Sequence, residues 1–169
     1  MRLQSLILSS CFLLIFACAD ESSENSSDRE NCPITFENGN LMTGSSADVF
    51  GNALKYPSGD AAITSQVNVW KPGFKSPWHY HPYTGVAYVI QGELTVNFDT
   101  ITSVEDKSSE KTVTTTQTYK AGEKAFLGAA NVWHFSENLG DKDLIFMVTW
   151  LGEENGPVVV MEQQRDSGN

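Results

Sequence analysis

The residues of this chain best suited to chemistry are three histidines, and the chain has no further histidine. His79 and His81 stand two apart in the segment PGFKSPWHYHPY, and His134 follows in NVWHFSEN. Imidazole is the commonest metal-binding side chain. If the first pair lies on a strand, both rings project from one face and Tyr80 from the other. Two structural or surface histidines produce the same H-x-H string, so on this pattern alone a metal site and a structural pair both remain open.

The surrounding sequence predicts many short strands and no long helix. Segments that are rich in β-branched and aromatic residues, or that alternate apolar with polar residues, cover 62–70, 86–90, 94–98, 112–119 and 143–151. Turns with Gly and Pro separate them, which is typical of an all-β sandwich or barrel. We expect the charged segment 105–111 to form the solvated end of a hairpin, and residues 158–160 to add an edge strand.

The context of the histidine pair resembles the first motif of the cupin superfamily. Gly73 precedes His79 by six residues, and the string H-x-H-P-x-x-G begins at His79. Gly92 follows His81 by eleven residues, at the end of an apolar run. The whole span has the form G-x5-H-x-H-P-x-x-G-x6-G, in which Gly85 stands where the cupin motif has a glutamate.

The third histidine lies in a looser form of the second cupin motif. Gly122 supplies the opening turn, and Gly128 occupies the region of the motif's proline. Asn138 follows His134 at the distance that the motif expects. The segment has one residue more than usual, and the motif's proline and second glycine are missing. His134 is still assigned to the motif because it is the only histidine downstream of the first pair.

This resemblance covers residues 59–150 and implies an all-β fold, the double-stranded β-helix or jelly-roll cupin barrel. It also implies that His79, His81 and His134 hold a divalent transition metal inside one end of the barrel. Iron, zinc, manganese, nickel and copper all accept imidazole ligands. No reaction is implied, because cupins include isomerases, epimerases, dioxygenases, decarboxylases, seed-storage proteins and sensors.

The missing carboxylate is the main departure from the cupin pattern. Gly85 cannot bind a metal, so three neutral imidazoles leave more coordination positions open to water, an anionic substrate or dioxygen. Related three-histidine cupins, the thiol dioxygenases among them, hold ferrous iron in such a site, and we therefore favour iron. With Gly85 facing inward, strand alternation turns Ala87 and Val89 inward too, and we expect empty space for a ligand beside the metal.

Neighbouring side chains are predicted to complete the site. Ser136 and Asn138 share the predicted face of His134 and are expected to support the ligands, whereas Glu137 should point away. Trp133 is one of several aromatic residues that could line the mouth of the pocket, although core packing is the favoured interpretation for each of them. The others are Trp78, Tyr83 and Phe135.

Three functions fit these residues. The first is a metal-dependent enzyme, most plausibly an iron dioxygenase that acts on a small polar molecule, and the second is a non-catalytic module that holds a metal or a small ligand. A sugar isomerase or epimerase ranks last, because the extra basic and acidic residues that such cupins need are not recognisable. A cupin that has lost its metal is a further alternative. Family analogy alone suggests a homodimer, formed through apolar segments near Phe50 and Val158.

Length and charge restrict the partners. The 169 residues predict one globular domain with a core large enough to need no disulfides. The formal net charge of -10, without a cluster of Lys and Arg, argues against a nucleic-acid partner. Cys32 is the only cysteine after residue 18, which leaves no internal disulfide in an exported, processed chain.

The N-terminus resembles an export signal. An apolar run over residues 6–16 follows Met1-Arg2 and is too short to be a comfortable membrane span. The sequence up to Cys18 resembles a bacterial lipoprotein box, so that Cys18 would be lipidated and would tether the protein to a membrane. Ordinary signal cleavage remains the alternative. The sequence thus predicts a signal over residues 1–18, a polar linker over 19–40, the domain over 41–162 and a tail over 163–169.

Overall fold

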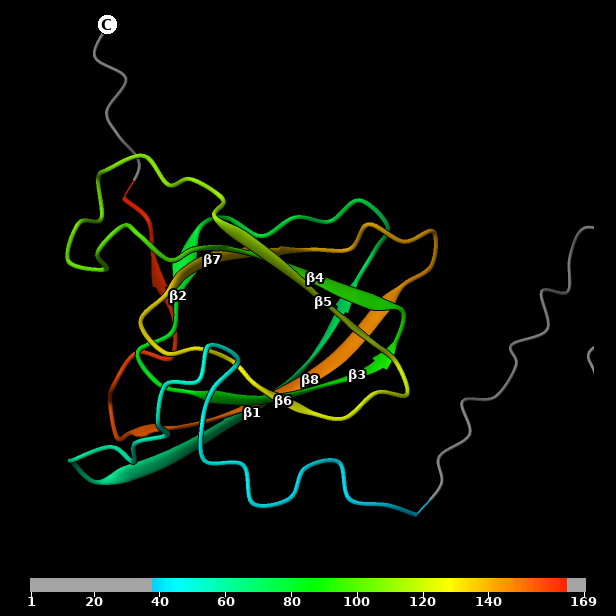
Figure 1. The fold of residues 1–169 in the computed structure, drawn as a ribbon, viewed down its shortest axis with the longest axis horizontal. Helices are drawn as coiled ribbons and strands as arrows, with labels where there is room; N and C mark the ends of the chain where they lie inside the picture. The colour runs from blue at the N-terminus through cyan, green and yellow to red at the C-terminus, as the bar shows by residue number, and fades with distance from the viewer. Residues whose placement is uncertain (1–37, 164–169) are drawn as a thin grey trace, which may run out of the picture. The chain divides into compact units, whose positions relative to one another are not determined.

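The computed structural model describes residues 38–163 and arranges them as nine strands in two sheets (Figure 1). The predicted export signal with Cys18, most of the linker, and the tail after residue 163 lie outside the described residues, and the division into these segments stays a prediction. Within residues 38–163, no helix has the length and hydropathy required to cross a bilayer.

Every strand pairing is antiparallel. In chain order the strands are β1 (Ala61–Trp70), β2 (His79–Tyr80), β3 (Gly85–Gln91), β4 (Glu93–Asp99), β5 (Thr115–Lys120), β6 (Phe126–Leu127), β7 (Trp133–Glu137), β8 (Leu144–Glu153) and β9 (Val160–Met161). One sheet has the order β1-β8-β3-β6, and the other has the order β5-β4-β7-β2-β9. The predicted all-β jelly-roll barrel is confirmed.

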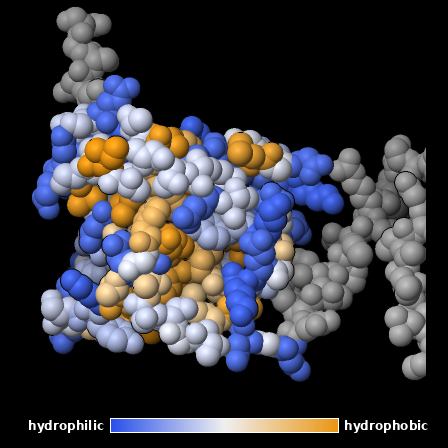
Figure 2. All heavy atoms as spheres, in the orientation of Figure 1, coloured by the Kyte–Doolittle hydropathy of each residue, from blue (hydrophilic) through white to orange (hydrophobic). Residues whose placement is uncertain are grey.

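The core lies between the two sheets and follows from strand alternation. β8 alternates buried and half-buried residues along its whole length, because one face meets the core and the other faces outward. Its inward residues pack against those of β3 and β4. The buried core consists of Ala87, Val89, Leu94, Val96, Phe98, Leu144, Phe146, Val148 and Trp150. Hydrophobic residues are visible in the middle of the face in Figure 2, with hydrophilic residues around them.

A tight turn joins β3 to β4 at Gly92, whose φ of +79° lies in the left-handed region. A side chain there would be strained, and its Cβ would come within 3.2 Å of the Cα of Leu144. The glycine therefore lets the turn lie against the start of β8. This turn reverses the chain from one sheet into the other, so it positions β3 and β4 on opposite walls of the barrel.

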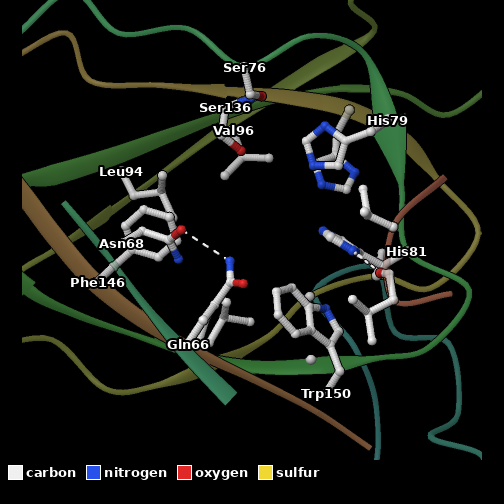
Figure 3. Close-up of a pocket in the computed structure, with 18 of the residues that line it drawn as sticks. Gln66, Asn68, Ser76, His79, His81, Leu94, Val96, Ser136, Phe146 and Trp150 are labelled. Carbon is white, nitrogen blue, oxygen red and sulfur yellow. Dashed lines mark hydrogen bonds between the residues drawn. The ribbon is translucent and has the colours of Figure 1, made fainter. Parts of the chain in front are cut away.

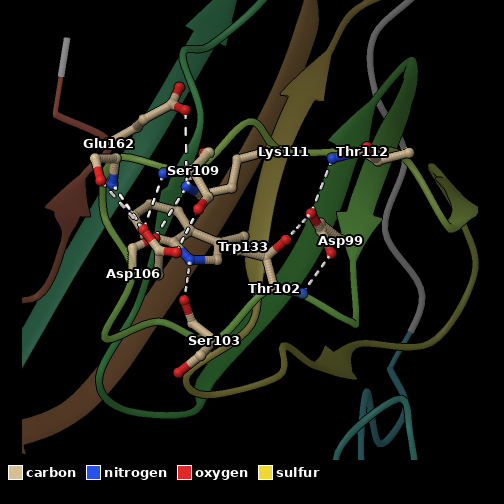
Figure 4. A network of polar contacts seen from close by, with 10 residues as sticks. Asp99, Thr102, Ser103, Asp106, Ser109, Lys111, Thr112, Trp133 and Glu162 are labelled. Atoms are coloured by element: carbon tan, nitrogen blue, oxygen red, sulfur yellow. Dashed lines mark hydrogen bonds and ion pairs between the residues drawn. The ribbon is translucent and has the colours of Figure 1, made fainter. Parts of the chain in front are cut away.

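The loop between β4 and β5 is fastened to the barrel at both ends (Figure 4). The Asp99 carboxylate, which is 1% exposed, accepts hydrogen bonds from the backbone amides of Ile101, Thr102 and Thr112. The Thr102 hydroxyl donates to it as well. Because the amide of Thr112 is engaged with this carboxylate, regular pairing of β5 with β4 begins only at Thr115, later than the sequence predicted.

The expectation of a fully solvated loop is wrong for Lys111. Its side chain is fully buried, with the Nζ atom 4.5 Å from the centroid of the Trp133 ring (Figure 4). The ammonium donates to the backbone carbonyl of Asp106 at 3.1 Å and lies 3.8 Å from a carboxylate oxygen of Glu162. Cation–π attraction and these oxygen partners explain how a lysine can be buried here.

Candidate metal centre

Strand pairing brings the three histidines together. His79 on β2 lies directly opposite His134 on β7, and His81 follows immediately after β2. The ring centroids of His79 and His134 are 4.3 Å apart, and the ring of His81 is 5.1 Å from each of them. One nitrogen atom from each ring can be chosen so that all three lie within 4.8 Å of one another. The cluster can therefore hold one metal ion, as the resemblance to cupins implied.

Backbone carbonyls fix the orientation and the tautomer of all three rings. The Nδ1 atoms of His79, His81 and His134 lie 2.8, 2.5 and 2.9 Å from carbonyl oxygens. The oxygens belong to Pro77, Val158 and Val132, respectively. A carbonyl oxygen only accepts, so each Nδ1 must carry the hydrogen, which leaves the lone pair of each Nε2 free to bind a cation. Such outer hydrogen bonds are typical of metal-binding histidines.

Burial keeps these rings neutral. It lowers the pKa of His79, and it lowers the pKa of His81 to about 4 against the carbonyl of Val158, which favours the protonated form. Burial and the charges of the other two histidines lower the pKa of His134 well below its usual range. At neutral pH all three rings are therefore unprotonated and available as ligands.

The place of the missing carboxylate is filled. Gly85 faces inward as expected, but a Cβ on it would lie 2.8 Å from Nε1 of Trp150 and 3.1 Å from a methyl carbon of Val148. Trp150 is the residue paired with Gly85 across β3 and β8, and its ring centroid lies 4.9 Å from that of His81. The indole therefore takes the place of a side chain on Gly85, while the expected space for a ligand lies next to it, in a cavity that Gly85 and Ala87 both line.

A family comparison agrees with this geometry. Residues 67–150 match the family model described as "Cupin domain". Those residues form a cupin domain. A search of curated protein sequences gives no match.

Solved structures with similar folds include several enzymes. An oxalate decarboxylase from Lactobacillus farciminis is 20% identical over 59% of this chain and 26% of that chain, with a TM-score of 0.44. The DMSP lyase of Ruegeria pomeroyi is 15% identical over 59% and 42% of the two chains, also at 0.44. An L-ribose isomerase mutant of Acinetobacter is 18% identical over 53% and 47%, again at 0.44. This chain thus spans less than half the length of each of these proteins.

The barrel contains an open cavity of about 280 Å³ beside the histidines (Figure 3). Its walls are mostly aromatic and aliphatic, and within residues 38–163 the only titratable side chains that line it are His79, His81 and His134. Four polar, uncharged side chains also reach it, namely Gln66, Asn68, Ser76 and Ser136. In Figure 3, Gln66 and Asn68 lie across the cavity from His79 and His81.

Of Ser136 and Asn138, only Ser136 lines the cavity, and its backbone N–H donates a hydrogen bond to the Ser76 hydroxyl oxygen at 2.9 Å. Asn138 lies elsewhere, because β7 ends at Glu137 and strand alternation no longer applies. Its amide group donates to the carbonyls of Trp70 and Lys142, so it fastens the turn between β7 and β8. The expectation that Asn138 supports the ligands is wrong.

Trp133 is also absent from the cavity. It neighbours His134 in β7 and so projects from the opposite face, where its ring lies 4.9 Å from that of Tyr80. Its indole N–H donates to the carbonyl of Ser103 at 3.1 Å. None of Trp78, Tyr83 and Phe135 lines the cavity either. Glu137 points away from the histidines, as predicted, and accepts a hydrogen bond from Asn97.

Four groups at the site were not predicted from the sequence, namely Gln66, Asn68, Trp150 and the Val158 carbonyl. A signal for two of them was available in β1, where polar and β-branched residues alternate. Aliphatic residues of an alternating strand ordinarily face the core, but Val67 and Val69 are 60% and 56% exposed. The polar members of the alternation face the cavity instead.

Proposed function

We propose that His79, His81 and His134 bind one divalent transition metal, with ferrous iron the first choice, and that the adjoining cavity binds a small molecule. The observation that carries this proposal is the proximity of three rings whose Nδ1 atoms are all engaged by carbonyls. This leaves three Nε2 lone pairs free, and one ligand nitrogen from each ring lies within 4.8 Å of the others. Neutral imidazoles suit iron, zinc, nickel and copper better than calcium or magnesium, which prefer oxygen ligands.

We further propose oxygenase chemistry on the bound molecule. When iron is bound, it supplies open coordination positions for dioxygen and for a donor atom of the substrate. The protein itself contributes the mostly apolar walls that exclude water, and the hydrogen bonds that hold the imidazoles in place. Trp150 lies where a side chain on Gly85 would begin, which would leave three neutral imidazoles as the protein ligands.

A non-catalytic ligand-binding module is the second candidate. The observation that favours it is the cavity lining, which within residues 38–163 has no carboxylate, lysine, tyrosine or cysteine to act as a general acid or base. The same observation disfavours a sugar isomerase, whose reaction moves protons between carbon and oxygen. An oxygenase needs no such group if the metal activates both reactants, so the first candidate remains preferred.

Metal analysis and oxygen uptake separate the two candidates. The purified protein would be analysed for bound metals, reconstituted with ferrous iron without oxygen, and mixed with thiols, diketones and phenols in an oxygen electrode. Stoichiometric iron with uptake that disappears in His81→Ala supports the oxygenase. Tightly bound zinc with no uptake contradicts it and favours the binding module. No metal after reconstitution contradicts both.

Tyr80→Phe is the matched control for the histidine variant. Tyr80 stands between the two ligands in sequence, but its ring packs against Trp133 on the outer face of the sheet. The substitution keeps that packing and removes only a hydroxyl. Metal content and oxygen uptake should both match those of the unmodified protein. A loss as large as that of His81→Ala would mean that the loss reflects disturbance of β2 and not removal of a ligand.

A further inference from the structure

Strand β1 turns two amide side chains toward the cavity. Gln66 lines it from an exposed position and Asn68 is half-buried, while Ile63, Val67 and Val69 on the other side of the strand are 71%, 60% and 56% exposed. Exposing three large aliphatic residues while turning amides inward forgoes favourable burial. Such inversions of the ordinary pattern are expected where function overrides stability.

The two amides form a pair with one unused donor. The Nε2 atom of Gln66 donates to Oδ1 of Asn68 at 3.1 Å, which fixes how the Asn68 amide is turned (Figure 3). The Nδ2 atom of Asn68 is buried, and it is the only buried side-chain nitrogen or oxygen without a hydrogen-bond partner among residues 38–163. A buried amide donor left unpaired costs about 1–3 kcal/mol, so its retention calls for an explanation.

We infer that Asn68 donates a hydrogen bond from Nδ2 to an uncharged acceptor on a small, flat ligand, at the end remote from the histidines. This inference rests on the proposed function in one respect: the other end of the ligand places an oxygen donor atom on the metal. Gln66 acts as a positioning residue, because its own hydrogen bond occupies Oδ1 of Asn68 and leaves the N–H group for the ligand.

The walls of the cavity define the class of ligand. Five aromatic rings face it, from Trp70, Phe98, Phe126, Phe146 and Trp150. A volume of about 280 Å³ suits a molecule of about one ring. Among residues 38–163 no lysine or arginine lines the cavity, so a carboxylate at the remote end would lack a positively charged partner. The ligand class is therefore a single-ring phenol or enol that carries a neutral carbonyl group away from its metal-binding oxygen.

Three phenols of nearly the same shape test this inference. They carry an acetyl, an isopropyl or a carboxylate group opposite the hydroxyl: 4-hydroxyacetophenone, 4-isopropylphenol and 4-hydroxybenzoate. Calorimetric titration of the zinc-loaded protein should show the acetyl compound binding about fivefold to tenfold more tightly than the isopropyl compound, the effect of one hydrogen bond, with the carboxylate weakest. Failure of all three to bind, or equal affinities for the first two, overturns the inference.

Two variants assign the preference to the amide pair. Asn68→Leu should reduce the ratio of acetyl to isopropyl affinity to about one, while the outward-facing Val67→Thr should leave it unchanged. Gln66→Glu should also abolish the preference, because its carboxylate only accepts and would turn the Asn68 amide so that Oδ1 faces the ligand. A preference that persists in Asn68→Leu contradicts the inference.

Thermal unfolding separates a ligand-binding role of Asn68 from a structural one. Asn68→Leu removes an unpaired donor, and the Gln66 amide that loses its acceptor is exposed to water, so the unfolding midpoint of the metal-free protein should stay the same or rise. Asn97→Leu is the matched control, because the Asn97 amide is buried with partners on both atoms, Glu137 and Thr116. That variant should lower the midpoint by several degrees. An equal fall in both variants would make Asn68 structural and overturn the inference.

The affinity ratio also distinguishes this inference from the proposed function. Metal content is measured first, and the same three phenols are titrated into metal-free protein. If no metal binds, the proposed function fails, yet an acetyl preference that depends on Asn68 still supports the amide pair. If metal binds stoichiometrically and the acetyl preference is missing, the metal site stands and the inference fails.

Discussion

Two polar clusters occupy neighbouring positions of the β4–β7 pair and differ in whether their hydrogen-bonding capacity is used. Phe98 of β4 lies opposite His134 of the histidine cluster, whereas the next residue, Asp99, lies opposite Trp133 and holds the loop after β4. Asp99 receives four hydrogen bonds from protein groups. Each histidine uses one ring nitrogen and keeps the other free. A saturated cluster stabilises the fold, and an unsaturated one can bind a ligand.

The clusters also differ in what sets their ionisation. Burial would raise the pKa of Asp99, but hydrogen bonds from Thr102, Thr112 and Ile101 outweigh it and lower the pKa to about 2. Burial dominates for the histidines and lowers their pKa values, with that of His81 at about 4. At neutral pH the carboxylate is therefore charged and satisfied, whereas the imidazoles are neutral and available. This difference makes the roles of the clusters separable by experiment.

Removing one histidine should produce the largest effect, and chiefly on metal binding. His81→Ala should weaken zinc affinity about 1,000-fold, or about 4 kcal/mol, well beyond the 10- to 100-fold typical of outer hydrogen-bond partners. The free energy of unfolding of the metal-free protein should change far less, because the removed ring donates only one hydrogen bond. Competition titration against a chelator and urea unfolding measure the two quantities. Equal losses in zinc affinity and in the free energy of unfolding would contradict the difference in role between the two clusters.

Acid should destabilise the metal-free protein in two separate windows. Because folding lowers the pKa of His81 from 6.5 to about 4, the unfolded chain takes up protons first, and stability falls as the pH drops from 6.5 to 4. This residue alone accounts for about 3 kcal/mol. Asp99 stabilises the fold above pH 3.8, and its contribution is lost as the pH falls from 3.8 toward 2.

Urea unfolding at a series of pH values measures both windows. His81→Ala should reduce the loss between pH 6.5 and 4 and leave the lower window unchanged, while Asp99→Asn should do the reverse. The shared reference is the unmodified, metal-free protein at pH 8, where both clusters are in their favoured forms. A stability that stays flat from pH 6.5 to 4 would contradict the view that burial sets the ionisation of the histidines.

The histidine cluster could be predicted because local rules place it. The two-residue spacing puts His79 and His81 on one side, and β7 brings the only other histidine opposite the first of them. Alternation also correctly turned Glu137 away, and the same rule, applied to Trp133, would have excluded it from the pocket. For Asn138 the rule failed because the strand had already ended.

What escaped prediction depends on pairing between distant strands. Trp150 fills the space beside Gly85 because β3 and β8 pair in that register, which no local pattern reveals. Likewise the carbonyl of Val158 reaches His81 from a segment 77 residues along the chain. For β1 the prediction failed for another reason: its aliphatic residues face outward, so the usual rule that such residues face the core does not apply. The pattern of strands in the sequence was enough to predict the fold class. Predicting the details of the site would have required the register in which distant strands pair.

Weakening the saturated cluster should affect stability and leave metal binding intact. Asp99→Asn keeps the size of the side chain but replaces one acceptor oxygen with a donor that faces backbone N–H groups. We expect a loss of about 2 kcal/mol in the free energy of unfolding. Zinc affinity should stay within about twofold, because the carboxylate faces away from the cavity. Weaker zinc binding together with normal stability would reverse the roles of the two clusters.

The smallest expected effect is the coupling between Gly85 and Trp150, and it tests whether the histidine cluster can be completed. Gly85→Glu should destabilise the metal-free protein, because the Cβ atom alone would lie 2.8 Å from the indole nitrogen. Trp150→Ala should destabilise it by opening a cavity. In the double variant the glutamate fills the vacated space, so the two losses should fall short of their sum by about 1 kcal/mol.

Metal affinity gives the second reading of this cycle. The double variant should bind zinc more tightly than Trp150→Ala alone, because a carboxylate then joins the three imidazoles, while Gly85→Ala in the same background adds no ligand and serves as the control. Urea unfolding and chelator competition on all four members of the cycle measure these effects. Strictly additive losses and unchanged zinc affinity would show that Trp150 does not occupy the place of a fourth ligand, and that the three-histidine set has another cause.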